Sequence, residues 1–88
     1  MKIKNGFLLR EVAGSYIVVA TGALAKEFGG IIKLNETGSF LWKMLTENAD
    51  IQALTEALTR EYEVSKDDAE KDVQSFVKML LDAGILEK

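Results

Sequence analysis

The stretch Ile31-Ile32-Lys33-Leu34-Asn35-Glu36-Thr37-Gly38-Ser39-Phe40-Leu41-Trp42 marks the point where the sequence changes its hydrophobic period. Strand-like runs precede it, and apolar residues at helical spacing follow it. Ile31 to Leu34 favours a strand, because branched apolar residues suit a pleated, half-buried surface. Asn35 is a favoured N-cap, so a helix is predicted to begin at Glu36. The sequence therefore predicts a strand that becomes a helix with no loop between them.

Gly38 is unusual within this helix, which is predicted to run from Glu36 to about Glu47. A glycine inside a helix is less favourable than alanine by up to ~1 kcal/mol. We therefore predict that another backbone or side chain comes close to Gly38. Trp42 lies off the main apolar stripe, so this helix is predicted to be apolar around much of its circumference and central in the fold.

Two strand-like runs come earlier in the chain, at Phe7 to Ala13 and at Tyr16 to Ala20. The link between them is Gly14-Ser15, and a two-residue link with glycine predicts a tight hairpin. The irregular stretch Thr21 to Gly30 follows, and its final glycine pair gives the backbone freedom before the third strand. A meander of these strands would leave Ile31 to Leu34 at an edge of the sheet.

Two further helices are predicted in the second half of the chain. Asp50 is a plausible N-cap for a helix that continues to about Tyr62, and Ser65 begins a capping-box pattern for a helix that ends near Ala83. Gly84 then supplies the left-handed C-terminal cap. The predicted fold class is α+β, resembling a winged helix-turn-helix, with a three-stranded antiparallel sheet followed by a three-helix bundle in one domain, residues 1–88.

Composition restricts the chemistry that the chain can perform. The 88 residues include no cysteine and no histidine, so thiolate metal sites are excluded and the commonest general base is absent. We therefore predict no enzymatic activity, no cofactor and no metal. The longest apolar runs are far shorter than the ~18 residues of a membrane span. Met1 to Asn5 is polar, lacks the apolar core of a secretory signal and is predicted to be frayed, so a cytoplasmic location is expected.

Three groups of residues together resemble a known family. They are Leu34-Asn35-Glu36-Thr37-Gly38-x-Phe40-Leu41-Trp42, the earlier Gly6-Phe7-x-Leu9-Arg10-Glu11-Val12, and the closing Gly84-Ile85-Leu86. In order and spacing they resemble the PqqD-like family, also called RiPP recognition elements. The resemblance implies a non-catalytic adaptor that binds the leader segment of a ribosomally made precursor peptide. It further implies a partner enzyme that modifies the peptide, either a radical SAM protein or another enzyme.

The resemblance also implies where the leader binds. The leader would add as a strand to the third strand, in a cleft walled by the third helix, a known mode of peptide recognition. The expected peptide-binding residues are Gly30, Ile31, Ile32, Lys33, Leu34, Asp72, Phe76 and Met79. Two of them have an alternative interpretation: Lys33 could simply protect an edge strand against aggregation, and Met79 could be a spare surface hydrophobe.

Two other functions are compatible with the predicted fold. A winged helix could bind DNA, but the third helix opens with Asp67, Asp68, Glu70 and Asp72, and the chain has a net charge of −3. Both features would repel the negatively charged phosphate backbone, so no nucleic-acid partner is expected. The remaining alternative is a purely structural subunit, or a homodimer formed through the free sheet edge.

Overall fold

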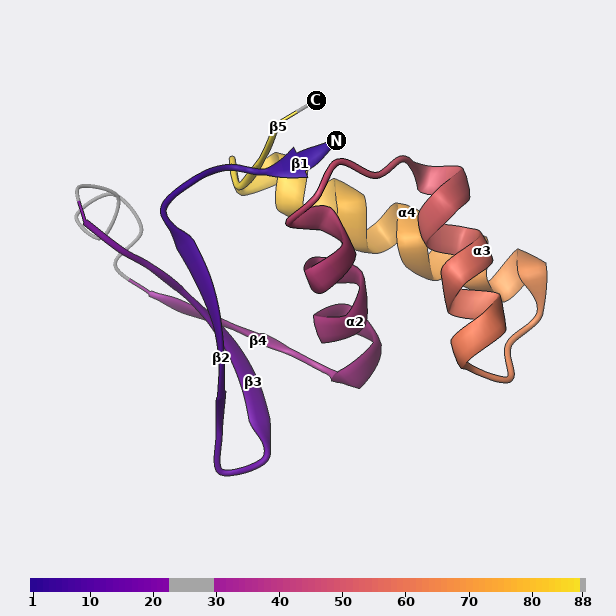
Figure 1. The fold of residues 1–88 in the computed structure, drawn as a ribbon, viewed down its shortest axis with the longest axis horizontal. Coiled ribbons are helices and arrows are strands. Elements are labelled where there is room, and N and C mark those ends of the chain that lie inside the picture. The colour runs from indigo at the N-terminus through magenta and orange to yellow at the C-terminus, as the bar shows by residue number, and fades with distance from the viewer. Residues whose placement is uncertain (23–29, 88) are drawn as a thin grey trace.

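The computed structural model describes residues 1–22 and 30–87, so most of the irregular stretch Thr21 to Gly30 lies outside the described residues. In the described part, a three-stranded antiparallel sheet is followed by three helices, which confirms the predicted α+β class (Figure 1). The elements are β1 (Lys2–Ile3), β2 (Phe7–Val12), β3 (Ser15–Ala20), β4 (Ile31–Leu34), α2 (Glu36–Leu45), α3 (Ile51–Glu61), α4 (Lys66–Asp82) and β5 (Leu86–Glu87).

The main sheet has the predicted meander order β2-β3-β4, which places β4 at an edge of the described strands. The hairpin between β2 and β3 turns at Ala13 and Gly14, one residue earlier than predicted, because Ser15 pairs with Val12. Both turn residues have positive φ, 51° and 79°. Such a pair matches the twist of a two-residue hairpin, and Gly14 adopts it without steric strain.

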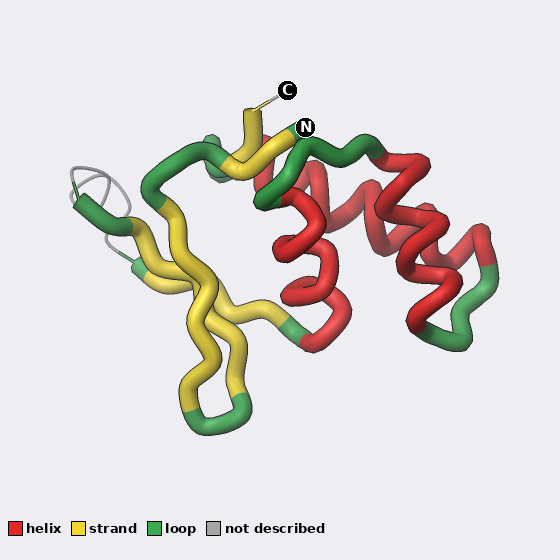
Figure 2. Tube along the Cα trace, in the orientation of Figure 1, coloured by secondary structure: helices red, strands yellow, loops and turns green. Residues whose placement is uncertain are grey.

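A second small sheet joins the two ends of the described chain (Figure 2). Ile3 in β1 pairs with Leu86 in β5, and the Lys4 N–H donates to the Ile85 carbonyl at 2.8 Å. Ile3 is only 6% exposed. The prediction that Met1 to Asn5 is frayed is therefore wrong, because burial of one apolar side chain and pairing with a distant strand hold this segment in place.

All three predicted N-caps are confirmed. Asn35 Oδ1 accepts a hydrogen bond from the Gly38 N–H at 2.7 Å. The caps of α3 and α4 are built in the same way, by Asp50 and Ser65. At the other end of α4, Gly84 has φ 76°, as its predicted role requires.

The helix α2 ends at Leu45, two residues earlier than predicted. Thr46 closes it, because its N–H donates to the Trp42 carbonyl and its hydroxyl donates to the Lys43 carbonyl. Trp42 is only 2% exposed and belongs to the core cluster, as does Val18 of the sheet. The predicted central position of α2 is confirmed, since α2 follows β4 directly and also packs against α3.

Candidate functional site

The main-chain groups at the edge of β4 can be oriented from the hairpin. The Thr21 N–H donates to the Gly6 carbonyl at 2.7 Å, and this pair continues the register between β2 and β3. Hydrogen-bonded and non-hydrogen-bonded pairs alternate along antiparallel strands. The odd-numbered residues of β3 therefore direct their N–H and C=O groups to β2, and the even-numbered residues direct theirs to β4.

The same alternation continues in β4. Ile32 and Leu34 stand opposite even-numbered residues of β3, so their main-chain groups complete the ladder to β3. Ile31 and Lys33 consequently direct their N–H and C=O groups away from the sheet, toward the open edge. No described strand pairs with this side of β4, and an edge without a partner strand can pair with an added one.

The side chains of β4 alternate as the main chain does. Ile32 and Leu34 are half-buried and pack against the core cluster. Ile31 and Lys33 are exposed on the opposite face of the sheet. The edge thus offers main-chain partners at the same two residues whose side chains point to the outer face.

A groove of about 300 Å³ begins where β4 ends, between the start of α2 and the middle of α4. It brings together three residues that the sequence assigned to the peptide site, Asp72, Phe76 and Met79. Met79, which is 42% exposed, lies in its lining. The complete lining is Asn35, Thr37, Gly38, Leu41, Asp72, Ser75, Phe76 and Met79.

Gly38 explains how α2 and α4 come so close beside this groove. A Cβ atom on Gly38 would lie 3.4 Å from Cε1 of Phe76 and 3.4 Å from Cβ of Leu34. It would also lie 3.0 Å from Oδ1 of Asn35, which accepts the capping hydrogen bond. The predicted close approach at Gly38 is confirmed, and the missing side chain helps to keep the groove open.

Not all of the expected residues share this groove. Gly30 to Leu34 lie along the edge strand, outside the groove lining. Gly30, Ile31 and Ile32 instead line a smaller hollow of about 140 Å³ with three residues of β2 and β3, namely Phe7, Val18 and Ala20. The expected site is therefore an edge followed by a groove, with Leu34 next to Gly38 at the junction.

Five groove residues were not assigned to the site from the sequence. Four of them, Asn35, Thr37, Gly38 and Leu41, belong to the capped start of α2, and the fifth is Ser75 of α4. In α2 the local signals were the N-cap and the glycine, which indicate where a helix begins but not what it lies beside. Helical spacing places Ser75 on the same flank of α4 as Asp72 and Met79. Among the described residues that line the groove, Asp72 alone is ionisable.

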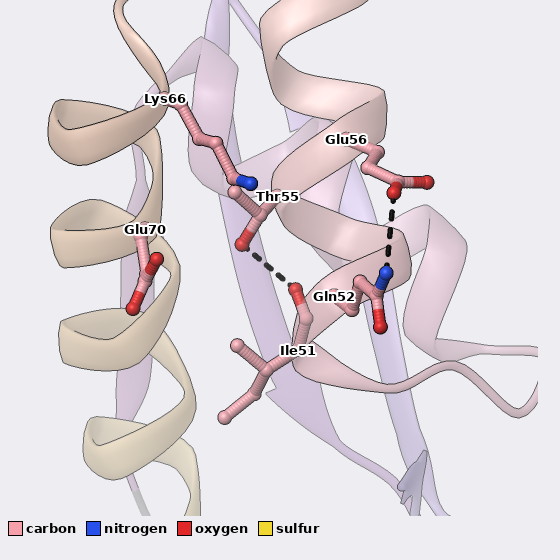
Figure 3. A pocket seen from close by; sticks show the side chains of 6 residues that line it. All are labelled: Ile51, Gln52, Thr55, Glu56, Lys66 and Glu70. Atoms are coloured by element: carbon pink, nitrogen blue, oxygen red, sulfur yellow. Dashed lines mark hydrogen bonds between the residues drawn. The ribbon is translucent and has the colours of Figure 1, made fainter.

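A third hollow, of about 250 Å³, lies between α3 and α4 (Figure 3). Its polar side chains from α3 are hydrogen-bonded within that helix: the Thr55 hydroxyl donates to the Ile51 carbonyl at 2.8 Å, and the Gln52 amide donates to Glu56 at 3.4 Å. Lys66 and Glu70 of α4 complete the lining. No residue of β4 takes part, so this hollow is separate from the edge and the groove.

Within residues 1–22 and 30–87, no three side chains of the His, Cys, Asp and Glu types gather so that they could hold a metal ion. Likewise, none of the helices in the described ranges combines the length and the apolar character needed to cross a membrane.

The fold and the site define a small α+β domain with an open sheet edge beside an interhelical groove. The chain belongs to the family described as coenzyme PQQ synthesis protein D (PqqD), which matches residues 8–86. Two solved structures have the same fold. One of them is "TbiB1 in Complex with the TbiA(beta) Leader Peptide", which is 23% identical with a TM-score of 0.79. The similarity covers 99% of this chain and 95% of the TbiB1 chain.

The second structure is "Lasso peptide synthetase B1 complexed with the leader peptide". It is 21% identical with a TM-score of 0.76, and the similarity covers 96% of this chain and 93% of the other. No curated protein sequence matches the chain.

Proposed function

We propose that this chain is a non-catalytic adaptor that binds the leader segment of a ribosomally synthesised precursor peptide. The leader would add as a strand to β4. The observation that carries this proposal is the orientation of Ile31 and Lys33, whose main-chain groups face the open edge. Strand addition uses such groups for affinity and uses neighbouring pockets for selectivity.

Family membership and the two related structures support the same proposal. Both structures of this fold were determined with a leader peptide, and both match nearly the whole chain. The chain also lacks histidine and cysteine, so it is poorly equipped for general acid–base or thiol chemistry. We infer that a separate enzyme, a radical SAM protein or another peptide-modifying enzyme, performs the chemistry.

The alternation of side chains determines which leader residues would face the helices and which would face outward. Leader residues opposite Ile32 and Leu34 would face the helices and reach toward the groove of Phe76 and Met79. Leader residues opposite Ile31 and Lys33 would face outward. An acidic leader residue opposite Lys33 would form a favourable cross-strand pair.

The two alternative functions are less well supported. The exposed acids at the start of α4, Asp67 and Asp68, would repel a phosphate backbone. A homodimer through the β4 edge would use the same main-chain groups as the leader. Excess leader would dissociate such a dimer, whereas it would not change the oligomeric state of a monomeric adaptor.

An amide-shift titration tests the proposal. The titrant is a synthetic peptide with the leader sequence of the cognate precursor. The largest shifts are expected at residues 30–34 and at Asp72, Phe76 and Met79, with little change at Gln52 and Glu56 of the separate hollow. Saturable shifts that are confined to α3, or no shifts with the cognate leader, would refute leader binding at β4.

A further inference from the structure

The outer face of the main sheet carries a continuous apolar row. Leu8 of β2 stands directly opposite Val19 of β3, and Val19 stands directly opposite Ile31 of β4. Leu8 is 44% exposed and Ile31 is 59% exposed. Two of the largest exposed apolar side chains therefore lie in one line across all three strands, on the side opposite the core.

A basic row runs beside the apolar row. Arg10 stands opposite Ile17, and Ile17 stands opposite Lys33, so two exposed cations flank a central isoleucine. The remaining outward residues of the three strands are Val12 and Ser15. Within these strands the outer face thus has two positive charges and no acidic residue, although the chain as a whole has a net charge of −3.

Neither the described helices and strands nor the proposed leader covers this face. The inward residue Val18 instead belongs to the core cluster that the helices share, and α2 is the helix that lies next to the sheet (Figure 1). A leader added to the edge of β4 would widen the sheet, and its outward side chains would continue the two rows beyond Ile31 and Lys33. The outer face would remain accessible while the leader is bound.

The charge distribution distinguishes between the candidate occupants of this surface. A second copy of the chain would bring Arg10 and Lys33 near identical cations, and like charges across an interface are unfavourable. A surface with apolar side chains bordered by carboxylates would instead match both rows. Electrostatic complementarity of this kind also accelerates association with the correct partner.

We propose that the row Leu8, Val19 and Ile31, flanked by Arg10 and Lys33, is the docking surface for the peptide-modifying enzyme, which offers an apolar patch bordered by carboxylates. This inference rests on the proposed adaptor function. The docked enzyme would lie over the sheet and next to the added leader strand. It would thereby contact the adaptor and the substrate on one continuous face.

The test uses variants of β2, the strand farthest from the leader edge. Leu8→Asp places a charge in the apolar row, and Arg10→Glu reverses one cation. Lys71→Glu is the matched control, because Lys71 is exposed on α4 and its substitution changes the net charge as Arg10→Glu does. Two affinities are measured for each protein: the affinity for the synthetic leader alone, and the affinity for the enzyme that modifies the same precursor, without leader.

We expect Leu8→Asp and Arg10→Glu to weaken enzyme binding by about tenfold or more and to leave leader affinity within about twofold. Lys71→Glu should change neither affinity. Added salt should weaken enzyme binding by the parent more than by Arg10→Glu, because screening acts on the charge that the variant lacks. Circular dichroism establishes that each variant is folded, and Arg10→Glu decides the question if Leu8→Asp does not fold.

Enzyme affinity that is unchanged in folded Leu8→Asp and Arg10→Glu would overturn the docking surface. So would a parent protein that dimerises in sedimentation while Leu8→Asp is monomeric, since a second copy would then occupy this face. Failure of the parent to bind the leader would instead contradict the proposed function. The two failures are separable because enzyme affinity is measured in the absence of leader.

Discussion

Phe76 on α4 lies so close to Gly38 on α2 that a Cβ atom added to Gly38 would be 3.4 Å from Cε1 of the ring. The same atom would be 3.0 Å from Oδ1 of Asn35. That oxygen is held by hydrogen bonds from the Gly38 N–H at 2.7 Å and the Thr37 hydroxyl at 3.0 Å. The glycine therefore lets the N-cap and the aromatic ring occupy adjacent positions at the groove.

Gly38→Ala should not give the stabilisation of up to ~1 kcal/mol that alanine usually brings to a helix interior. The new methyl group would press on the Asn35 oxygen, which already accepts two hydrogen bonds. We therefore expect an unchanged or lower free energy of unfolding in urea. We also expect weaker leader binding, because the methyl group would narrow the groove. A variant that is stabilised by the full amount would show that Asn35 and Phe76 move aside freely.

Asn35→Ala should destabilise the protein by about 1 kcal/mol through loss of the N-cap of α2. Asp50→Ala is the matched control, since its carboxylate accepts from the Ala53 N–H at the same distance of 2.7 Å. Both variants should lose similar stability in chemical denaturation. Leader affinity should fall only for Asn35→Ala, which lies between the edge strand and the groove. Equal leader affinities in the two variants would separate this junction from peptide binding.

Met79→Asp should leave the unfolding free energy nearly unchanged, because Met79 is 42% exposed. It should weaken leader binding by more than ~1 kcal/mol, since a carboxylate would be desolvated beside the bound peptide. Calorimetric titration measures the effect. Gln74→Asp introduces the same charge at an exposed position of α4 outside the groove lining, and should bind like the parent. Parent-like binding by folded Met79→Asp would place the groove outside the leader site.

Proline substitutions in β4 should separate folding from binding. Ile32→Pro removes an N–H that bonds to β3, so its melting temperature should fall markedly. Lys33→Pro removes an N–H that faces the open edge, so the fold should survive while leader affinity falls. Lys33→Gln, which keeps the N–H, measures the contribution of the charge alone. The edge assignment would be wrong if Lys33→Pro bound leader as tightly as Lys33→Gln.

Tyr62 provides a prediction about alkaline pH. Its ring packs edge-on against Phe40, with centroids 5.7 Å apart. Burial, and then the nearby carboxylates of Glu36 and Glu61, raises the pKa of Tyr62 above its ordinary value of 10.0. A raised pKa favours the neutral form in the native state, so its contribution to stability is present below pH 10 and is lost as pH rises through the native pKa. The unfolding free energy of Tyr62→Phe should therefore fall less steeply above pH 10 than that of the parent.

The parts of the fold that local chemistry determines could be predicted from the sequence. The caps at Asn35, Asp50 and Ser65, the left-handed Gly84 and the order of the strands all depend on residues close together in the chain. The pairing of β1 with β5 could not be predicted in this way. It depends on Ile3 meeting Leu86 across the whole chain, and one apolar residue in a polar segment gives no periodic signal.

The candidate site was predicted only in outline. Of the residues expected to bind the peptide, Asp72, Phe76 and Met79 on α4 do line one groove. The opposite wall depends on how α2 approaches α4, which is a tertiary contact of Gly38 with Phe76. The outer face was not anticipated either, because the row from Leu8 to Ile31 exists only once the register of three strands is known.

The direct junction at Asn35 fixes the position of the edge strand relative to the groove. A single residue separates the last pair of the β4 ladder from the helix that lines the groove, so the edge and the groove cannot shift independently. Because side chains alternate along a strand, a leader displaced by one residue would turn its inward set outward. If one residue were inserted within the paired segment of the leader, the side chains beyond the insertion would point to the opposite face of the sheet. If two residues were inserted, these side chains would point to their original face.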